Sequence, residues 1–256
     1  MRNILIICRK ELKGYFASPI AYLLMAFFAL IFGFFFYSAT RFLLMQTLQA
    51  QMMGRGMPPM DLNEWIIRPL LMNASVVALF LIPMITMRLF AEEKRSGTIE
   101  LLLTSPIRDS EIIVGKWLAA MLMYAAILLF SGINIIMLFS YGKPDWKPIL
   151  VGYLGLLLQG GCLLAVGTFI STTTRNQIIA GGATFAVCLL LWVLDWVSSY
   201  ETTTTGKVIA YLSVVTHFEP FSKGVIDMKD VIFYISMIFF GLFLTARSME
   251  SLRWRA

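Results

Sequence analysis

Six long apolar segments follow one another along this chain of 256 residues. An α-helix needs about 20 apolar residues to cross roughly 30 Å of hydrocarbon, and each segment approaches or exceeds that length. The segments are continuously apolar rather than alternating, which argues against the strands of a membrane β-barrel. Because 59% of the residues are apolar and only 14% are charged, the chain has more hydrophobic surface than one water-soluble core buries. The sequence therefore predicts an all-α polytopic membrane protein made of one domain. The predicted spans are residues 20–41, 69–90, 112–141, 149–171, 177–197 and 231–247.

The distribution of Lys and Arg predicts the orientation of these spans. With a cytoplasmic N-terminus, thirteen of the 21 Lys and Arg residues fall on the cytoplasmic side, which is the bias expected for inner loops. Six spans then return the C-terminus to the cytoplasm. The net charge of +6 is therefore explained by topology and by contact with anionic lipid, and no long basic tract indicates a nucleic-acid partner. The thirteen residues are Arg2, Arg9, Lys10, Lys13, Arg88, Lys94, Arg95, Arg108, Lys116, Arg175, Arg247, Arg253 and Arg255.

Residues 1–18 are predicted to form an amphipathic helix that lies on the inner leaflet. At about 100° per residue the apolar side chains share one face, while Arg9, Lys10 and Lys13 occupy the adjoining one. These charges interrupt the apolar run before it reaches the length of a signal peptide, so we expect the segment to be retained. Two interpretations stay open. The helix either only sets orientation, or it also docks a cytoplasmic partner.

Residues 92–108, between the second and third predicted spans, combine a dense charge cluster with a short predicted helix. Charged side chains cost several kcal/mol each in hydrocarbon, so this loop emerges into water. Gly97 permits a tight reversal, Thr98 is a good N-cap, and Glu100 falls in the first turn of the helix that follows. Pro106 ends that helix at residue 105 or earlier. An apolar ridge that can enter a groove of another protein remains, made of Ile99, Leu102 and Leu103.

The connection between the first two spans, residues 42–68, is rich in methionine. Thioether clusters suit Cu(I), but no cysteine or histidine nearby completes a ligand set, and methionine is a common gap filler. Copper binding and an ordinary outer loop both remain as interpretations. None of the three cysteines falls in an outer loop, so we expect no disulfide. The methionines concerned are Met45, Met52, Met53, Met57 and Met60.

The connection between the last two spans, residues 198–229, is too apolar for a free aqueous loop and too short to span the membrane. A re-entrant or interfacial hairpin fits it best. It contains His217, the single histidine of the chain. Three roles are open for this side chain: a structural or gating residue, a ligand for metal or substrate, and a catalytic base.

Polar side chains inside the predicted spans are candidates to line a transport path, although hydrogen bonding between helices explains them as well. Pairs and single glycines in the spans indicate close helix packing, including at a seam between two copies. The path candidates are Asn73, Thr86, Asn134 and Thr184.

The charged loop resembles the cytoplasmic coupling loop of the ABC-2 type exporter permeases. The residues of that motif occur here in the same order, as Glu93, Gly97-Thr98, Glu100, Leu102-Leu103 and Pro106, followed by Gly115-Lys116. The segment His217-Phe-Glu-Pro-Phe-Ser-Lys-Gly-Val-Ile-Asp227 is similar to permeases of the gliding-motility type, and more distantly to those of nitrous-oxide-reductase maturation.

The resemblance implies the ABC-2, or type V, exporter fold and a place in the bacterial cytoplasmic membrane. It also implies a non-catalytic subunit without cofactors of its own, because the P-loop pattern is missing and ATP with Mg²⁺ is then bound by a partner. Implied partners are two copies of a P-loop ATPase, a second permease copy or a homologous permease, and a periplasmic or gliding-type auxiliary subunit. The implied ATPase-coupling residues are Glu92, Glu93, Arg95, Gly97, Thr98, Glu100, Leu102, Leu103 and Pro106, and the implied outer gate is His217, Glu219, Pro220, Phe221 and Gly224.

Two other classes of function are alternatives to an exporter subunit. An intramembrane enzyme needs convergent nucleophiles, bases or metal ligands at membrane depth, and the spans hold no histidine and no paired carboxylates. A scaffold that uses the same ATPase contact for mechanical signalling, without moving solute, is compatible with the same residues.

Overall fold

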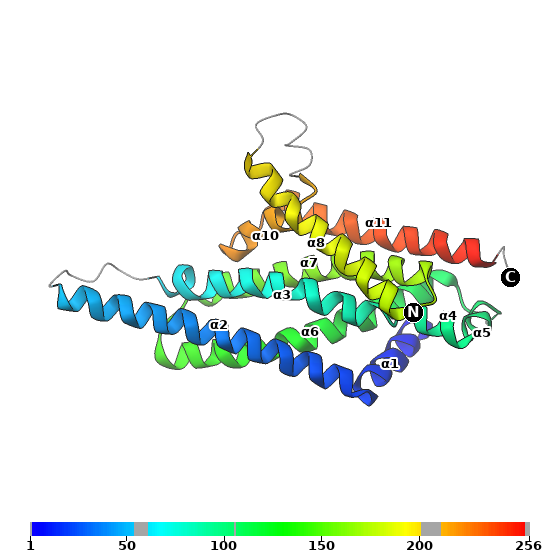
Figure 1. Cartoon of the computed structure of the whole chain (residues 1–256), viewed down its shortest axis with the longest axis horizontal. Coiled ribbons are helices and arrows are strands. Elements are labelled where there is room, and N and C mark those ends of the chain that lie inside the picture. Colours follow the sequence, from blue (N-terminus) through cyan, green and yellow to red (C-terminus); the bar gives the residue numbers. More distant parts are fainter. Residues whose placement is uncertain (1, 54–60, 105, 201–210, 254–256) are drawn as a thin grey trace.

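The structure is a computed structural model that describes residues 2–53, 61–104, 106–200 and 211–253, all of whose regular elements are helical (Figure 1). The remaining residues include Met57 and Met60 of the methionine-rich connection and residues 201–210 of the predicted outer hairpin, which lie outside the description. The helices are α1 (Arg2–Ala17), α2 (Pro19–Met52), the π-helix η1 (Asn63–Ile67), α3 (Arg68–Thr86), α4 (Ala91–Ser96), α5 (Ile99–Thr104), α6 (Asp109–Tyr141), α7 (Trp146–Thr173), α8 (Gln177–Tyr200), α10 (Val214–Ser222) and α11 (Met228–Arg253).

Six helical segments of the described chain are long and apolar enough to cross a membrane, which confirms the predicted all-helical, six-span architecture. The first of them, α2, continues well past the predicted end at residue 41, because no Gly or Pro follows until Gly54. The candidate spans are Pro19–Met52, Asn63–Ser96, Asp109–Ser140, Trp146–Thr173, Gln177–Asp195 and Met228–Arg253.

The N-terminal helix α1 leaves the bundle at an angle to α2 (Figure 1). The break lies at Ser18, whose hydroxyl accepts the N–H of Ile20 and caps α2, while Pro19 occupies the first helical turn where its missing N–H does no harm. On its buried side α1 packs against α6, where Ile7 comes so close to Gly115 that a Cβ there would lie 3.0 Å from the isoleucine side chain. That the helix rests on the inner leaflet stays a prediction.

Helices α3 and α7 form the centre of the bundle, and α2, α8 and α11 lie outside them. Glycines of α7 allow this close packing. A Cβ at Gly160 would lie 2.1 Å from the ring of Tyr124 in α6, and one at Gly167 would lie 2.4 Å from the hydroxyl of Thr86 in α3. These contacts agree with the interpretation of such glycines as helix-packing positions.

The two ends of the bundle carry different elements (Figure 1). The short helices α4 and α5 lie at one end, together with α1, the turn between α7 and α8, and the last turns of α11. The helix α10 and the π-helix η1 lie toward the other end of α3, and Arg68 at the start of α3 bonds Glu219 of α10. Charged side chains therefore gather at both ends.

Candidate functional site

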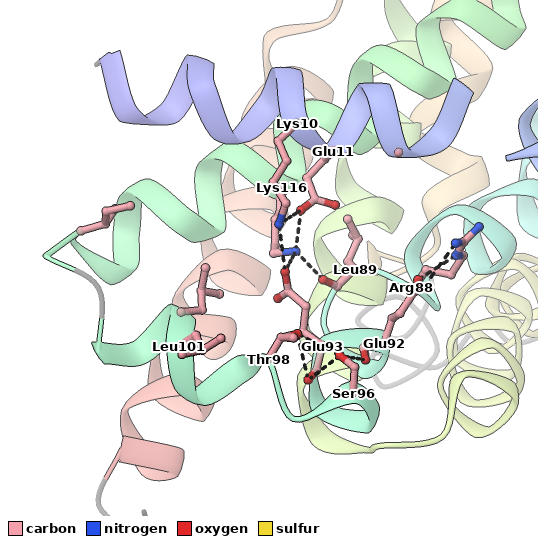
Figure 2. Close-up of a pocket in the computed structure, with 13 residues that line it drawn as sticks. Lys10, Glu11, Arg88, Leu89, Glu92, Glu93, Ser96, Thr98, Leu101 and Lys116 are labelled. Atoms are coloured by element: carbon pink, nitrogen blue, oxygen red, sulfur yellow. Dashed lines mark hydrogen bonds and ion pairs between the residues drawn. The ribbon is translucent and has the colours of Figure 1, made fainter. Parts of the chain in front are cut away.

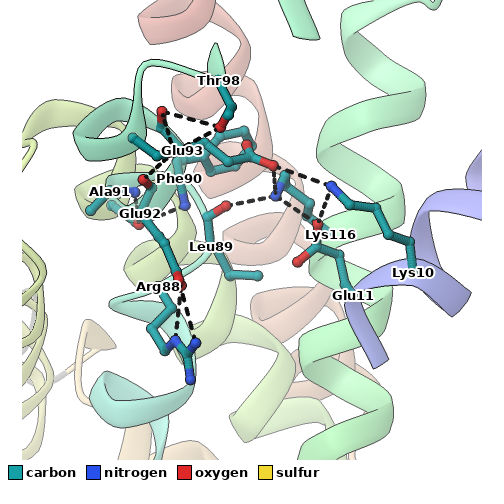
Figure 3. A network of polar contacts seen from close by, with 12 residues as sticks. Lys10, Glu11, Arg88, Leu89, Phe90, Ala91, Glu92, Glu93, Thr98 and Lys116 are labelled. Carbon is teal, nitrogen blue, oxygen red and sulfur yellow. Dashed lines mark hydrogen bonds and ion pairs between the residues drawn. The ribbon is translucent and has the colours of Figure 1, made fainter. Parts of the chain in front are cut away.

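A buried lysine joins three helices at the end of the bundle that carries α4 and α5 (Figure 3). Lys116 of α6 is only 1% exposed, and its Nζ donates to Oε1 of Glu11 in α1 at 2.9 Å and to Oε1 of Glu93 in α4 at 2.9 Å. Nζ also donates to the carbonyl oxygen of Leu89 at 2.7 Å, and it lies 5.1 Å from the centroid of the Phe90 ring. All three ammonium protons thus have acceptors, as a buried lysine requires.

Lys10 completes this cluster from the exposed side of α1. Its Nζ lies 3.6 Å from Glu11 and 3.7 Å from Glu93, so two cations face two carboxylates and the cluster is neutral. We call Lys10, Glu11, Glu93 and Lys116 the Lys116 junction. One atom of it is unsatisfied, because Oε2 of Glu93 is buried and has no hydrogen-bond partner among the described residues.

The start of α4 is fixed to α7 by a serine. The hydroxyl of Ser171 accepts the backbone N–H of Phe90 at 3.0 Å and of Ala91 at 3.2 Å, two donors that the first turn of a helix leaves free. One turn later the ammonium of Lys94 donates to the carbonyl of Thr172. The short helix is therefore held on α7 as well as on α1 and α6.

The reversal between α4 and α5 depends on Gly97, as predicted for this position. Its φ of 74° lies in the left-handed region that other residues rarely adopt, and it closes α4. The hydroxyls of Ser96 and Thr98, on either side, share a hydrogen bond of 2.9 Å. The chain then enters α5 at Ile99, and Thr98 is the residue just before it. We refer to residues 91–104, which form α4, the turn and α5, as the docking loop.

The predicted coupling residues divide into an inner and an outer set. Ile99 and Leu102 are half-buried against the core, whereas Leu101, which is not among the predicted coupling residues, is 73% exposed. The side chain of Leu103 lies outside the description. The exposed set holds Glu92, Arg95, Gly97, Thr98, Glu100 and Pro106, and on α1 it holds Arg9, Lys10 and Lys13.

A cavity of about 520 Å³ opens between α1, the docking loop and the start of α6 (Figure 2). Charged side chains from all three elements line it, together with the exposed Leu101. On its rim Arg88 pairs with Glu92 at 2.9 Å and also donates to Ser18 at 3.3 Å. Two side chains of α1 in this region have raised pKa values. Burial, reinforced by the negative charge of Glu11, raises the pKa of the Cys8 thiol and the pKa of the Tyr15 hydroxyl.

The residues predicted as an outer gate lie together on α10 and the turn after it, far from the docking loop (Figure 1). Glu219 bonds Lys223 at 2.8 Å and Arg68 at 3.2 Å, and these cations hold the pKa of its carboxyl below the ordinary value. Phe221 is buried against Gly155 of α7. Gly224, with a φ of 79°, ends the turn, and Pro220 lies inside α10 without interrupting it.

His217 is buried in α10 and bonds Asp230 of α11, with 2.6 Å between Nδ1 and Oδ1. Beside α10, a second cavity of about 690 Å³ is lined by charged residues of η1, α3, the connection between α6 and α7, and the end of α10. The four path candidates do not meet there, because neither this cavity nor the one at the docking loop is lined by any of them. Thr86 and Thr184 donate to carbonyls of their own helices, and Asn73 and Asn134 are half-buried.

Sequence reasoning missed four residues of this arrangement: Glu11, Leu101, Ser171 and Asp230. It placed Lys116 on the cytoplasmic side of the membrane but did not identify a buried ion cluster there. Local sequence gives little signal for such partners, since Glu11 and Lys116 are 105 positions apart and Phe90 and Ser171 are 81 apart. A carboxylate on the predicted interfacial helix and a lysine at the start of a span were the available hints.

Comparison with known proteins gives two findings. A family model described as ABC-2 family transporter protein matches residues 5–244. The chain is also similar to the probable multidrug ABC transporter permease YbhR of Escherichia coli, strain K12, with 24% identity over 179 residues, which cover 68% of this chain and 46% of that protein. The YbhR protein of Escherichia coli O157:H7 matches with the same figures. The chain thus spans about half the length of the curated relatives it matches.

Proposed function

The chain belongs to the ABC-2 family of transporter proteins, and we propose that it is the membrane-spanning subunit of an exporter driven by ATP hydrolysis on a separate ATPase. Permease subunits of this kind are not catalytic themselves. In this proposal the chain lies in the bacterial cytoplasmic membrane with both termini in the cytoplasm. Two ATPase copies, which bind ATP and Mg²⁺, dock on the end that carries the docking loop.

The Lys116 junction is the observation that carries this proposal. It fastens α4 of the docking loop to α1 and to α6, so a force applied to the loop reaches a membrane span directly. Ser171 adds a second connection, from the start of α4 to α7. A loop whose only task was to join two spans would not need buried charges in three-way contact, since such charges are costly to desolvate.

The exposed surface around the first cavity suits a protein partner. Leu101 exposes an apolar side chain on the same loop that exposes the charged residues Glu92, Arg95 and Glu100, a combination typical of the centre and rim of a protein interface. Ile99 and Leu102 pack against the hydrophobic core and hold the docking loop on it. We propose that Leu101 enters a cleft of the ATPase and that the charges around it set the register.

A second permease copy, identical or homologous, is proposed to pack along α2 and α8. An apolar groove of about 460 Å³ runs there over α3, lined by Phe27, Phe80 and Phe185 among others. Gly182 of α8 faces open space, as a Cβ there would meet nothing within 4 Å. Small residues beside a groove at membrane depth let a second helix approach closely.

The proposal is tested by affinity purification of the full chain from its native membrane in mild detergent, with mass spectrometry of the chains that copurify. A P-loop ATPase is expected with the wild type. We expect Leu101→Asp to reduce ATPase recovery at least about tenfold, since a charge replaces an interface anchor. Leu212→Asp, a matched change of an exposed leucine near α10, serves as the control and should keep the ATPase. Equal recovery with both variants contradicts the docking role of the loop.

A further inference from the structure

Six charged side chains line the cavity of about 690 Å³ that lies beside α10. They come from four separate segments of the chain: residues 61–64, the start of α3, the connection between α6 and α7, and the turn that follows α10. This side of the molecule is far from the docking loop (Figure 1). We call this space the η1 cavity. Its charged residues are Asp61, Glu64, Arg68, Lys143, Asp145 and Lys223.

The three carboxylates of the η1 cavity have no cation as a partner. Asp61 and Asp145 each accept, with Oδ1, the backbone N–H of the residue two positions further on, at 2.9 Å and 3.3 Å. Glu64, in the first turn of η1, is exposed. Within the part of the chain that the structure describes, none of these three carboxylates forms an ion pair. Each of them therefore keeps oxygen lone pairs for a ligand that donates hydrogen bonds.

The cations of the η1 cavity are only partly neutralised. Arg68 and Lys223 share one carboxylate, that of Glu219, at 3.2 Å and 2.8 Å. Lys143 is exposed and has no ion-pair partner among the described residues. With Glu219 included, four carboxylates and three cations give the site a net charge of −1 at neutral pH. The site therefore favours a ligand that carries an ammonium group, and its lysines can bind an anionic group of the same ligand.

Two tryptophans indicate that the η1 cavity lies at the level of the lipid headgroups. Trp65 follows Glu64 in η1 and is exposed, and such tryptophans are enriched where membrane and water meet. Trp146 follows Asp145 at the start of α7 and is exposed as well. One turn further along α7, Leu150 is exposed within a candidate membrane span. The headgroup of a membrane phospholipid therefore lies at the same level as the cavity.

We propose that the η1 cavity binds the phosphoethanolamine headgroup of a membrane phospholipid. The primary ammonium of this headgroup has three N–H donors, one for each of the three carboxylates without an ion pair. Its phosphate binds Lys143 and Lys223. Phosphatidylglycerol lacks the ammonium, and the quaternary ammonium of phosphatidylcholine has no N–H to donate. In the proposed orientation the lipid belongs to the outer leaflet, and the inference does not depend on the proposed ATPase contact.

The inference is tested by native mass spectrometry of the purified, delipidated full chain, titrated with phospholipids that have identical acyl chains. We expect phosphatidylethanolamine to bind with a Kd at least about tenfold lower than that of phosphatidylglycerol or phosphatidylcholine, because neither of these donates charge-assisted hydrogen bonds from an ammonium. If either of them binds as tightly as phosphatidylethanolamine, the proposal is overturned.

Asp145→Asn tests whether the lipid preference arises in the η1 cavity. The amide oxygen of asparagine still caps α7, so the fold is kept while the charge is removed. We expect the Kd of this variant for phosphatidylethanolamine to rise at least about fivefold. Asp227→Asn, which replaces a partly exposed carboxylate that does not line the cavity, is the control and should keep the wild-type Kd. An Asp145→Asn protein with the wild-type preference contradicts the proposal.

Lys143→Gln tests the phosphate contact. We expect its Kd for phosphatidylethanolamine to rise at least about threefold, since a charge-assisted bond to the phosphate is lost. Lys147→Gln, at an exposed lysine four positions away that does not line the cavity, is the control and should bind as the wild type does. Equal Kd values of the two variants contradict the assignment of the phosphate to Lys143.

Glycerophosphoethanolamine, which has the same headgroup without acyl chains, distinguishes a lipid from a soluble ligand. At a concentration equal to that of the lipid it should displace less than about half of the bound phosphatidylethanolamine, because it lacks the acyl chains that pack on the apolar surface of the spans. Displacement of half or more would assign the cavity to a soluble compound and overturn the proposal of a lipid.

Discussion

Glu93 and Lys116 lie 23 positions apart in the sequence, and their charged atoms meet at 2.9 Å between α4 and α6 (Figure 3). The pair ties the short helix that carries the exposed charges of the docking loop to a helix that crosses the membrane. Glu11 bonds the same ammonium from α1, so the three helices share one buried cation. A displacement of α4 must therefore either move α6 or separate the buried charges.

Lys116→Met tests this connection, since it keeps an unbranched side chain of similar size and removes its charge. The half-buried carboxylates of Glu11 and Glu93 would then have Lys10 as their nearest cation. Removing one partner of a buried ion pair costs about 3–5 kcal/mol, so we expect the melting temperature in detergent to fall by about 6 to 20 °C.

Arg88→Met is the matched control, because the pair of Arg88 with Glu92 is partly exposed and spans one turn of chain. Such pairs contribute about 1 kcal/mol or less, so its melting temperature should fall by a few degrees at most. A Lys116→Met protein as stable as the wild type would show that the junction does not hold the three helices together.

Ser171→Ala removes the acceptor of two backbone N–H groups at the start of α4. The loss of a helix cap costs about 0.5–2 kcal/mol, and we expect hydrogen exchange in residues 90–96 to become about two- to thirtyfold faster. Ser251→Ala, which removes a hydroxyl that donates to a carbonyl of its own helix α11, should leave this segment unchanged. Equal protection of residues 90–96 in both variants would contradict the anchoring role of Ser171.

The architecture and the turn of the docking loop could be predicted from the sequence because their causes are local. Continuous apolar runs of about 20 residues specify spans wherever they occur, and Ser18-Pro19 and Gly97 act on the backbone at their own positions. Each of these features needs only neighbouring residues to take effect.

The ion cluster and the orientation of α5 depend instead on tertiary packing. Whether Lys116 faces lipid headgroups or a pair of carboxylates is decided by where α1 lies on α6. In α5 the apolar positions Leu101 and Leu102 are adjacent, so periodicity over six residues does not identify the exposed one; the contact with the core turns Leu102 inward. His217 likewise acquires its acid partner only when α10 meets α11.

Gly97 and Gly14 give a pair of glycine substitutions with opposite expected signs. At Gly97 the left-handed φ of 74° makes Gly97→Ala destabilising by about 1–2 kcal/mol. Gly14 lies inside α1, where an added Cβ meets nothing within 4 Å, so Gly14→Ala should stabilise by about 0.5–1 kcal/mol. Melting temperatures of the two variants check this, and a fall in both would contradict the predicted gain at Gly14.

Gly182→Phe tests the proposed seam between two permease copies. The position faces open space in one copy, so the monomer should fold and melt as the wild type does. A large ring beside the groove would separate two helices that pack closely there, and we expect the dimer fraction in detergent to fall at least about tenfold, measured by native mass spectrometry. Gly132 of α6 also faces open space, so Gly132→Phe should leave the dimer intact. Equal dimer fractions in the two variants would show that α8 is not part of the seam.

The ion pairs of Glu219 predict that the attachment of α10 is sensitive to acid. Lys223 and then Arg68 lower the pKa of its carboxyl from the ordinary value of 4.5. A carboxyl whose pKa is lower in the folded chain contributes stability above its unfolded pKa, and that contribution is lost as the pH falls through the folded pKa. We therefore expect the melting temperature of the wild type to fall more steeply below about pH 4.5 than that of Glu219→Gln, whose amide does not titrate.

Hydrogen-exchange rates of the α10 amides are recorded at the same pH values. The control is Glu250→Gln, which replaces a partly exposed carboxylate of α11 that pairs with Arg247. The α10 exchange rates of this variant should change with pH as those of the wild type do. If Glu219→Gln and the wild type lose α10 protection in parallel on acidification, the ion pairs of Glu219 do not hold this helix.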